Sequence, residues 1–321
     1  GEMVRSTGHG FCGLARKELL AILDRRAASL GVRSHYGVEV DRATLEQSSD
    51  LVVASDGLNS AVRESAGERF GPCIDWRKAR FCWLGTDKPL GAFTFIFKEN
   101  EHGVWNIHAY PFERGEEPRS TWIVECDEDT WQRSGLGDGD EEATVRYVAD
   151  LFSDYLDGHE LLTNRSIWRV FPTVACATWV DGKTVLVGDS AHTAHFSIGS
   201  GTKLAMEDSI ALVDALIAAR TGADDADVPA ALASYQERRS VEVLKTQKAA
   251  QTSLEWFEHS GRYMAQDPVL FTFNLMTRSK RITYDNLALR DPELVESARR
   301  RFIEQEGGDP DATTLPAFTP F

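Results

Sequence analysis

The residues whose types and spacing best suit chemistry lie in one stretch, residues 188–208, with the sequence GDSAHTAHFSIGSGTKLAMED. An apolar run at residues 184–187 precedes it, and residues at helical apolar spacing follow. A strand, a glycine-rich turn and a helix N-terminus together form an anion site, because backbone N–H groups and the helix dipole both point toward the ligand. The stretch therefore predicts a dinucleotide site.

Three residues of this stretch fit such a ligand. Gly199 and Gly201 carry no Cβ, so a large planar ligand can approach the backbone closely. Asp189, at the end of the predicted strand, is placed to accept a hydrogen bond from a sugar or polyol hydroxyl. These features predict close contact between the backbone and a flat, hydroxyl-bearing ligand.

A second motif lies about 130 residues upstream, where a buried-strand pattern at residues 50–54 is followed by SDGLNSAVR at residues 55–63. Asp56 alone can be a turn residue at the end of a strand. Its combination with Ser60 and Arg63 favours a functional role instead. The chain therefore has two glycine-containing motifs, each placed directly after a predicted strand.

With both motifs present, the sequence resembles the FAD-dependent aromatic hydroxylases, the p-hydroxybenzoate hydroxylase-like flavoprotein monooxygenases. The family motif DGxxSxVR is matched by Asp56, Gly57, Ser60, Val62 and Arg63. The family motif GDAAHxxxPxxGxGxN is matched by Gly188, Asp189, Ala191, His192, Gly199 and Gly201. Two motifs in the right order are far more specific than a lone glycine-rich loop.

The resemblance implies FAD as the cofactor and identifies the residues that hold it. Arg16 stands where the arginine of the family's RxxLxxxL segment meets FAD. The cofactor-binding residues implied are Arg16, Asp56, Gly57, Ser60, Arg63, Gly188, Asp189, Gly199, Ser200, Gly201, Thr202 and Lys203. His192 is interpreted as a structural histidine near the cofactor.

Longer blocks resemble one branch of this family, the salicylyl-CoA 5-hydroxylases and 2-aminobenzoyl-CoA monooxygenase/reductases. These blocks are residues 9–23, 195–208 and 253–287. His195 and Phe196 replace the family's prolines beside the flavin, and we assign them to the substrate side as the catalytic pair. The resemblance extends over nearly the whole chain, to about residue 291.

The activity implied is a monooxygenase in which NADH or NADPH reduces FAD, O2 adds at the flavin C4a position, and the hydroperoxide hydroxylates an electron-rich ring. The implied substrate is an aromatic acyl-CoA such as salicylyl-CoA or 2-aminobenzoyl-CoA. A hydroxylase of a free aromatic acid and a non-catalytic flavoprotein-like remnant are the alternatives. No CoA motif is recognisable, and Arg77, Lys78 and Arg80 form the nearest basic cluster.

The fold class implied is α/β, a glutathione reductase-type FAD-binding domain with an inserted antiparallel substrate-binding sheet and C-terminal helices. We place the parts at residues 1–73, 74–165, 166–305 and 306–321. The one GxGxxG match, GHGFCG at residues 8–13, follows no apolar strand. We therefore expect that the first βαβ unit, which cradles the FAD pyrophosphate, is missing and that the sequence is a fragment. FTPF at residues 318–321 resembles the start of an old yellow enzyme-like flavin oxidoreductase domain, with an ordinary tail as the alternative.

Hydrophobic periodicity predicts the elements that must position these motifs. Alternation between residues 74 and 123 predicts an antiparallel sheet unusually rich in aromatic residues, as a platform facing a flat ligand would be. The alternative, which we favour for most of the individual residues, is that these Trp and Phe side chains fill the core. A first helix is expected at residues 15–30, with Leu19, Leu20, Leu23 and Leu30 facing inward, and strands at 33–40 and 51–54. Further helices are predicted at residues 141–155, 203–219, 229–257 and 268–277.

Two other chemistries fit the sequence less well. His192 and His195 are three residues apart, but no third ligand follows at a known spacing, so we predict no metal site. Residues 188–190 read GDS, as in a serine hydrolase. The one DxxH, however, is Asp189 to His192 and overlaps the nucleophile itself.

Composition agrees with a cytoplasmic enzyme of small molecules. The 321 residues carry a net charge of −15, which argues against nucleic acid and anionic membranes as partners. The five cysteines are odd in number and never in CxxC spacing, which suits reduced thiols in the cytosol. The partners that the family resemblance implies are an aromatic substrate, as a CoA thioester, and O2.

Overall fold

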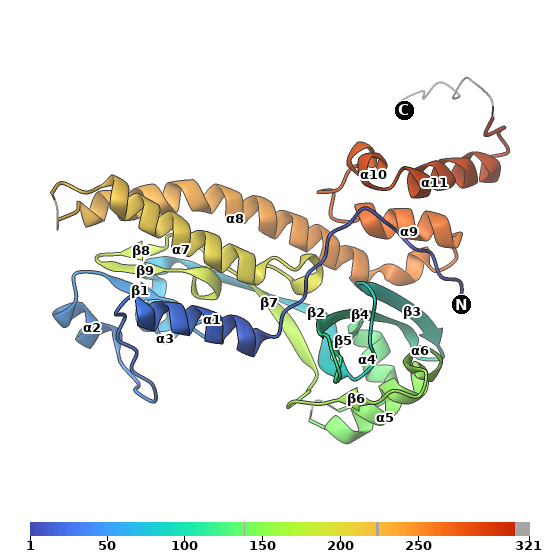
Figure 1. Cartoon of the computed structure of the whole chain (residues 1–321), viewed down its shortest axis with the longest axis horizontal. Helices are drawn as coiled ribbons and strands as arrows, with labels where there is room; N and C mark the ends of the chain where they lie inside the picture. The colour runs from blue at the N-terminus through green and yellow to red at the C-terminus, as the bar shows by residue number, and fades with distance from the viewer. Residues whose placement is uncertain (138, 223–224, 312–321) are drawn as a thin grey trace. The chain divides into compact units, whose positions relative to one another are not determined.

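The computed structural model describes residues 1–137, 139–222 and 225–311 of the chain (Figure 1). These residues form two compact units. The larger unit is Phe11–Leu254, and the smaller one combines Gly1–Gly10 with the described part of Glu255–Phe321. The architecture is α/β, as predicted, and the segment FTPF lies outside the described residues.

A small three-stranded sheet in the larger unit carries both sequence motifs. Strand β1 (Val52–Ala54) pairs in parallel with β9 (Thr184–Leu186), and β8 (Val180–Asp181) pairs antiparallel with β9. Parallel strands have their carboxyl ends at the same edge, so the segments that follow β1 and β9 are brought together there. The strands predicted at these two places are confirmed.

Two long helices, α7 (Gly201–Ala218) and α8 (Val228–Glu258), pack on this sheet, where they lie side by side (Figure 1). Their apolar residues form one core with the strands, because Leu204 and Leu212 of α7 and Leu232 of α8 are buried against Val185 and Leu186. This core fixes the turn between β9 and α7 from both sides. Both helices were predicted within a few residues.

A six-stranded antiparallel sheet forms the rest of the larger unit. Its strand order is β3-β4-β5-β2-β6, with β7 also paired to β2. The strands are β2 (Pro72–Thr86), β3 (Thr94–Asn100), β4 (Gly103–Glu113), β5 (Arg119–Cys126), β6 (Leu161–Leu162) and β7 (Arg169–Cys176). The predicted alternation is confirmed as four consecutive strands of this sheet.

One face of the six-stranded sheet is a conventional apolar core. Trp105, Ile107, Trp122 and Val124 are buried there with residues of the helices that cover the face. Those helices are α5 (Glu141–Leu151) and α6 (Ser153–Leu156), with α4 (Glu128–Ser134) beside β4. Since every second residue points to this core, the intervening residues form a second face with a different composition.

The smaller unit consists of helices α9 (Pro268–Thr277), α10 (Tyr284–Arg290) and α11 (Pro292–Gln305), together with the N-terminal segment. Asp291 joins them, because its carboxylate accepts hydrogen bonds from Ser6 Oγ at 2.8 Å, Thr7 N at 2.7 Å and Leu294 N at 3.1 Å. The helix predicted at residues 268–277 is confirmed.

Two local predictions near the N-terminus are wrong. Helix α1 (Arg16–Ser29) forms, but Leu20, Leu23 and Leu30 are exposed, because no layer of described residues covers that face. The strand expected at residues 33–40 does not form, since the described chain offers it no pairing partner. Two short helices, α2 (Arg42–Ser48) and α3 (Ala61–Ser65), flank β1 instead.

No helix among the described residues combines the length and apolarity that crossing a membrane requires. The five cysteines are free thiols. Burial raises the pKa of the Cys82 thiol to about 12 and that of Cys176 to about 11. Both side chains therefore stay protonated at neutral pH.

Candidate functional site

The two motifs meet at the shared edge of β1 and β9, where hydrogen bonds link them. Arg63, 6% exposed, donates from one terminal nitrogen to Ser190 O at 2.7 Å and from the other to Leu58 O at 2.5 Å. Ser190 Oγ donates to Ala54 O at 2.7 Å. Ser60 Oγ caps α3 by accepting from Arg63 N at 3.0 Å. Ser60 and Arg63 thus join the motifs, and direct contact with a cofactor stays a prediction for both.

A buried carboxylate that the sequence motifs did not identify holds the turn after β9. Asp208 of α7, 0% exposed, accepts from Gly188 N at 3.0 Å, His192 Nε2 at 2.7 Å and Arg239 Nε at 2.8 Å. Burial acts to raise the pKa of Asp208, but the hydrogen bonds from His192, Arg239 and Gly188 outweigh it and leave the pKa below its usual value. His192 thus helps to hold the turn through Nε2, while its buried Nδ1 has no hydrogen-bond partner among the described residues, and its structural role stays a prediction.

Gly188 is a position where the backbone requires glycine. Its φ is +63°, and a Cβ there would lie 2.9 Å from the Cβ of Ala205, so α7 packs directly on the turn. At Gly57, Gly199 and Gly201, in contrast, a Cβ would meet no described atom within 4 Å. The space beside these three glycines is open, which leaves room for a ligand against the backbone.

Asp189 presents its carboxylate to solvent at this edge. Desolvation by the surrounding protein raises its pKa, while the charges of His192 and Arg16 lower it in part. The structure thus brings Arg16, the first residue of α1, into electrostatic range of Asp189. A raised pKa means that the folded chain stabilises this carboxylate less well than water does.

The N-terminus of α7 contains an unsatisfied polar group. Ser200, 7% exposed, has a buried Oγ with no hydrogen-bond partner among the described residues. Buried hydroxyl groups rarely remain unpaired. Thr202 and Lys203 next to it are exposed, and Lys203 forms an ion pair with Glu207. Three features at this place fit an anionic, flat cofactor: the unpartnered hydroxyl of Ser200, the open space beside Gly199 and Gly201, and the N–H groups at the start of α7.

The second face of the six-stranded sheet is aromatic with a polar centre. The strand register places Phe81 opposite Glu125, Glu125 opposite Asn106, and Asn106 opposite Phe97. Two residues further along each strand the register aligns Trp83, Ile123, His108 and Phe95. Aromatic side chains therefore lie on this second face, which we call the platform, around an amide, an imidazole and a carboxylate, whereas Trp105 and Trp122 fill the core on the other face. That the platform meets a flat ligand stays a prediction.

The segment after the second motif reaches this platform. Phe196, in the single-turn helix η3 (Phe196–Ile198), has its ring centroid 4.8 Å from that of Phe81, 5.9 Å from Trp83 and 5.7 Å from His108. The ring of His195 lies 5.0 Å from that of Phe171 on β7. The catalytic pair assigned from the sequence thus connects the cofactor motif with the sheet.

A buried polar cluster lies under this contact. His195 Nε2 is 3.9 Å from Glu125 Oε1, and Glu125 Oε2 is 3.0 Å from His108 Nε2. The same nitrogen of His108 is 3.0 Å from Asn106 Oδ1. Each of these four residues is at most 2% exposed. Among the described residues no group of His, Cys, Asp and Glu has the arrangement of a metal site.

The basic cluster at residues 77–80 is already engaged in part. Arg77 pairs with Asp75 at 3.5 Å, and Arg80 pairs with Glu128 at 3.7 Å while its guanidinium stacks on Trp131 at 4.4 Å. Cations that are neutralised by neighbours bind an incoming phosphate less well. The structure thus gives this cluster little support as a phosphate site.

Comparisons with known proteins agree with this geometry. Residues 13–250 match the family described as FAD binding domain. The chain is 42% identical to salicyloyl-CoA 5-hydroxylase of a Streptomyces species over 92% of its own length and 57% of that protein. It is 39% identical to 3-hydroxy-4-methyl-anthranilyl-[aryl-carrier protein] 5-monooxygenase of Streptosporangium sibiricum, over 75% of its length and 62% of the relative.

The fold is also found among solved structures. The tetrameric form of 2-methyl-3-hydroxypyridine-5-carboxylic acid oxygenase superposes with a TM-score of 0.55 at 20% identity, covering 89% of this chain and 71% of that one. At this level of identity the likeness concerns the fold. The sequence comparisons and the fold therefore agree with each other. The chain spans only 57–62% of the length of the two relatives named above.

Proposed function

Because this chain belongs to the FAD binding domain family, we propose that it is part of a flavin-dependent hydroxylase that acts on an aromatic ring held as a thioester. The observation that carries the proposal is the contact between the cofactor motif and the aromatic platform, made by His195 and Phe196 over buried Glu125. The names of the relatives, a hydroxylase of salicyloyl-CoA and a monooxygenase of a carrier-bound anthranilyl group, support it.

FAD fits the residues present at the edge of β1 and β9. Asp189 offers an acceptor to a ribityl or ribose hydroxyl, the orphan Ser200 Oγ offers a donor, and Gly201 leaves the backbone accessible. When bound, the flavin supplies the redox chemistry, using NADH or NADPH and O2. The N-terminus of α7 stabilises negative charge at this place.

The residues of the sheet orient the ring and keep water out. The ring of Phe196 packs against the rings of Phe81 and Trp83. Together they form an apolar surface on which an aromatic ring can stack. Glu125 and His108 lie beside it and are shielded from water. A carboxylate there accepts a proton or a hydrogen bond from a hydroxyl or amino group ortho to the thioester, which raises the electron density of the ring.

The same carboxylate favours a thioester over a free acid. The two central strands place Asn106, His108, Tyr110, Thr121, Ile123 and Glu125 on the platform, and none of these is lysine or arginine. The imidazoles of His108 and His195 already face Glu125. A substrate carboxylate would therefore approach a like charge in a water-poor site, whereas a thioester carries no charge on its acyl group.

The first test of the proposal compares substrates. In the holoenzyme, we expect salicyloyl-CoA or 2-aminobenzoyl-CoA to accelerate NAD(P)H oxidation at least about tenfold more than the free acids do, since one excluded buried charge is worth at least about 1.4 kcal/mol. Product analysis should find a hydroxylated ring. Equal stimulation by the free acids would assign the chain to free-acid hydroxylases, and no stimulation by any aromatic would support a non-catalytic remnant.

A second test concerns Asp189. Asp189→Ala should weaken FAD binding by roughly ten- to a hundredfold, the loss expected for one charge-assisted hydrogen bond. FAD titration followed by fluorescence measures the change. Asp214→Ala is the control, because Asp214 is also an exposed aspartate but lies on α7, away from the turn that carries Asp189. Unchanged FAD affinity in Asp189→Ala would remove this residue from the cofactor site.

A further inference from the structure

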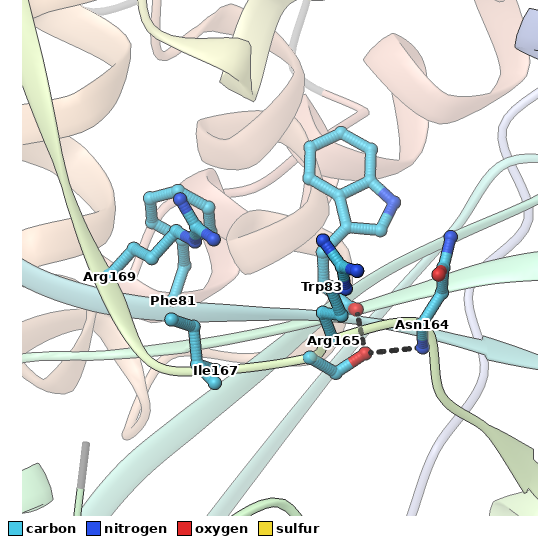
Figure 2. A pocket seen from close by; sticks show the side chains of 7 residues that line it. Phe81, Trp83, Asn164, Arg165, Ile167 and Arg169 are labelled. Carbon is cyan, nitrogen blue, oxygen red and sulfur yellow. Dashed lines mark hydrogen bonds between the residues drawn. The ribbon is translucent and has the colours of Figure 1, made fainter. Parts of the chain in front are cut away.

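A cavity of about 260 Å³ opens at the edge of the aromatic platform, between β2 and the segment that leads into β7 (Figure 2). Its walls are Phe81, Trp83, Asn164, Arg165, Ser166, Ile167 and Arg169. Phe81 and Trp83 also contact Phe196, so the cavity and the proposed ring site share two walls. The cavity therefore lies next to the proposed ring site.

Two arginines in this cavity have side chains open to solvent, and neither guanidinium forms an ion pair or hydrogen bond with a described residue. Arg169 is the register partner of Phe81, which places it on the platform face at its edge. Figure 2 shows both guanidinium groups among the cavity walls with the rings of Phe81 and Trp83. Two arginines that no described acidic residue neutralises thus lie beside aromatic rings, in a chain whose net charge is −15.

The backbone at Arg165 is held in a costly conformation. Its φ is +54°, in the left-handed region that disfavours residues with a Cβ. Ser166 fixes the segment, because its Oγ donates to Trp83 O at 2.7 Å and accepts from Asn164 N at 3.2 Å, while its N donates to Glu141 Oε2 at 2.5 Å. A glycine would relieve the strain, so the arginine side chain is retained at a cost in stability.

From this cavity we propose that Arg165 and Arg169 bind the phosphate groups of coenzyme A, the carrier portion of the thioester substrate. The inference rests on the proposed function and adds the place where the carrier is held. A guanidinium group binds two phosphate oxygens at once through parallel N–H donors, and both arginines are exposed at this cavity. The uncharged pantetheine arm crosses the apolar walls between the phosphates and the ring.

The test uses three thioesters of the same aromatic acid with the holoenzyme. The CoA thioester carries the full phosphate tail, the 4′-phosphopantetheine thioester carries one phosphate, and the N-acetylcysteamine thioester carries none. Arg169→Ala and Arg165→Gly should each raise KM for the CoA thioester roughly tenfold. The rise in KM should be smaller for the 4′-phosphopantetheine thioester and absent for the N-acetylcysteamine thioester. The KM for NAD(P)H should stay unchanged.

The choice of glycine at residue 165 separates binding from folding. Arg165→Gly removes the side chain at a positive φ, so its melting temperature should equal or exceed that of the wild type while CoA binding falls. Arg146→Ala is the control, because Arg146 on α5 is 69% exposed and its partner is the exposed Glu142. KM for the CoA thioester should not change in this control.

The outcomes distinguish this inference from the proposed function. If the wild-type holoenzyme does not turn over any thioester, the proposed function fails. If the wild type is active but the two variants raise KM equally for all three thioesters, or raise KM for NAD(P)H instead, the phosphate site is overturned. A loss confined to the phosphopantetheine and CoA thioesters supports it.

Discussion

Replacing Asp208 by alanine is expected to lower the free energy of unfolding by about 3–5 kcal/mol, the usual cost of removing one partner from a buried charged pair. The carboxylate is fully buried and joins three elements, through His192, Arg239 and the amide of Gly188. Its loss leaves the Arg239 guanidinium, 10% exposed, without its closest carboxylate. Urea denaturation of wild type and variant measures the difference.

Two further variants make this result specific. Asp214→Ala, at an exposed position of the same helix, should change stability by less than about 0.5 kcal/mol. Asp208→Asn keeps an acceptor in place without the charge and should fall between wild type and Asp208→Ala. If Asp208→Ala unfolds at the same urea concentration as the wild type, the three hydrogen bonds do not hold the turn in solution.

The same carboxylate sets an acid limit to stability. Its folded pKa is lowered, whereas an aspartate in the unfolded chain has a pKa of about 3.9. The stabilisation from Asp208 is therefore fully present above the unfolded pKa and is lost as the pH falls through the folded pKa. Between about pH 5 and pH 2, the stability of wild type should fall more steeply than that of Asp208→Asn.

The two turns that carry the proposed cofactor-binding residues could be located from sequence, because each turn belongs to a local motif. Strand patterns before Asp56 and Gly188 placed both turns at strand ends, and parallel pairing of β1 with β9 then brought them together. The motifs did not reveal that Arg63 and Asp208 hold the turn after β9 by hydrogen bonds. Their partners Ser190 and Arg239 are distant in sequence, and a hydrogen bond across such a separation leaves no periodic signal.

The polar centre of the sheet was missed for a different reason. Alternation between residues 74 and 123 correctly predicted strands, but period 2 does not reveal which residues of two strands lie opposite each other. Only the register brings Glu125 beside Asn106 and His108. The strand predicted at residues 33–40 failed for another reason. Its apolar pattern is local, whereas a strand also requires a neighbouring strand, which the described residues do not provide.

Glu125→Gln is the variant with the largest expected effect on activity. The amide keeps an acceptor for His108 Nε2, 3.0 Å away in the wild type, but removes the charge that we propose accepts a proton or hydrogen bond from the substrate. Turnover of an ortho-hydroxy or ortho-amino thioester should fall about a hundredfold, at the lower end of general-base effects. FAD content and melting temperature should stay close to wild type.

The charge of Glu125 also predicts a change in substrate preference. If like-charge repulsion excludes free aromatic acids, Glu125→Gln should narrow the ratio of thioester to free-acid stimulation, because an amide does not repel a carboxylate. Glu99→Gln, at an exposed position of β3, is the matched control and should leave both turnover and preference unchanged. A Glu125→Gln enzyme with wild-type turnover and an unchanged ratio would mean that the buried cluster stabilises the sheet without facing the substrate. A fall in turnover together with a narrowed ratio requires that the charge of Glu125 acts on the bound ring.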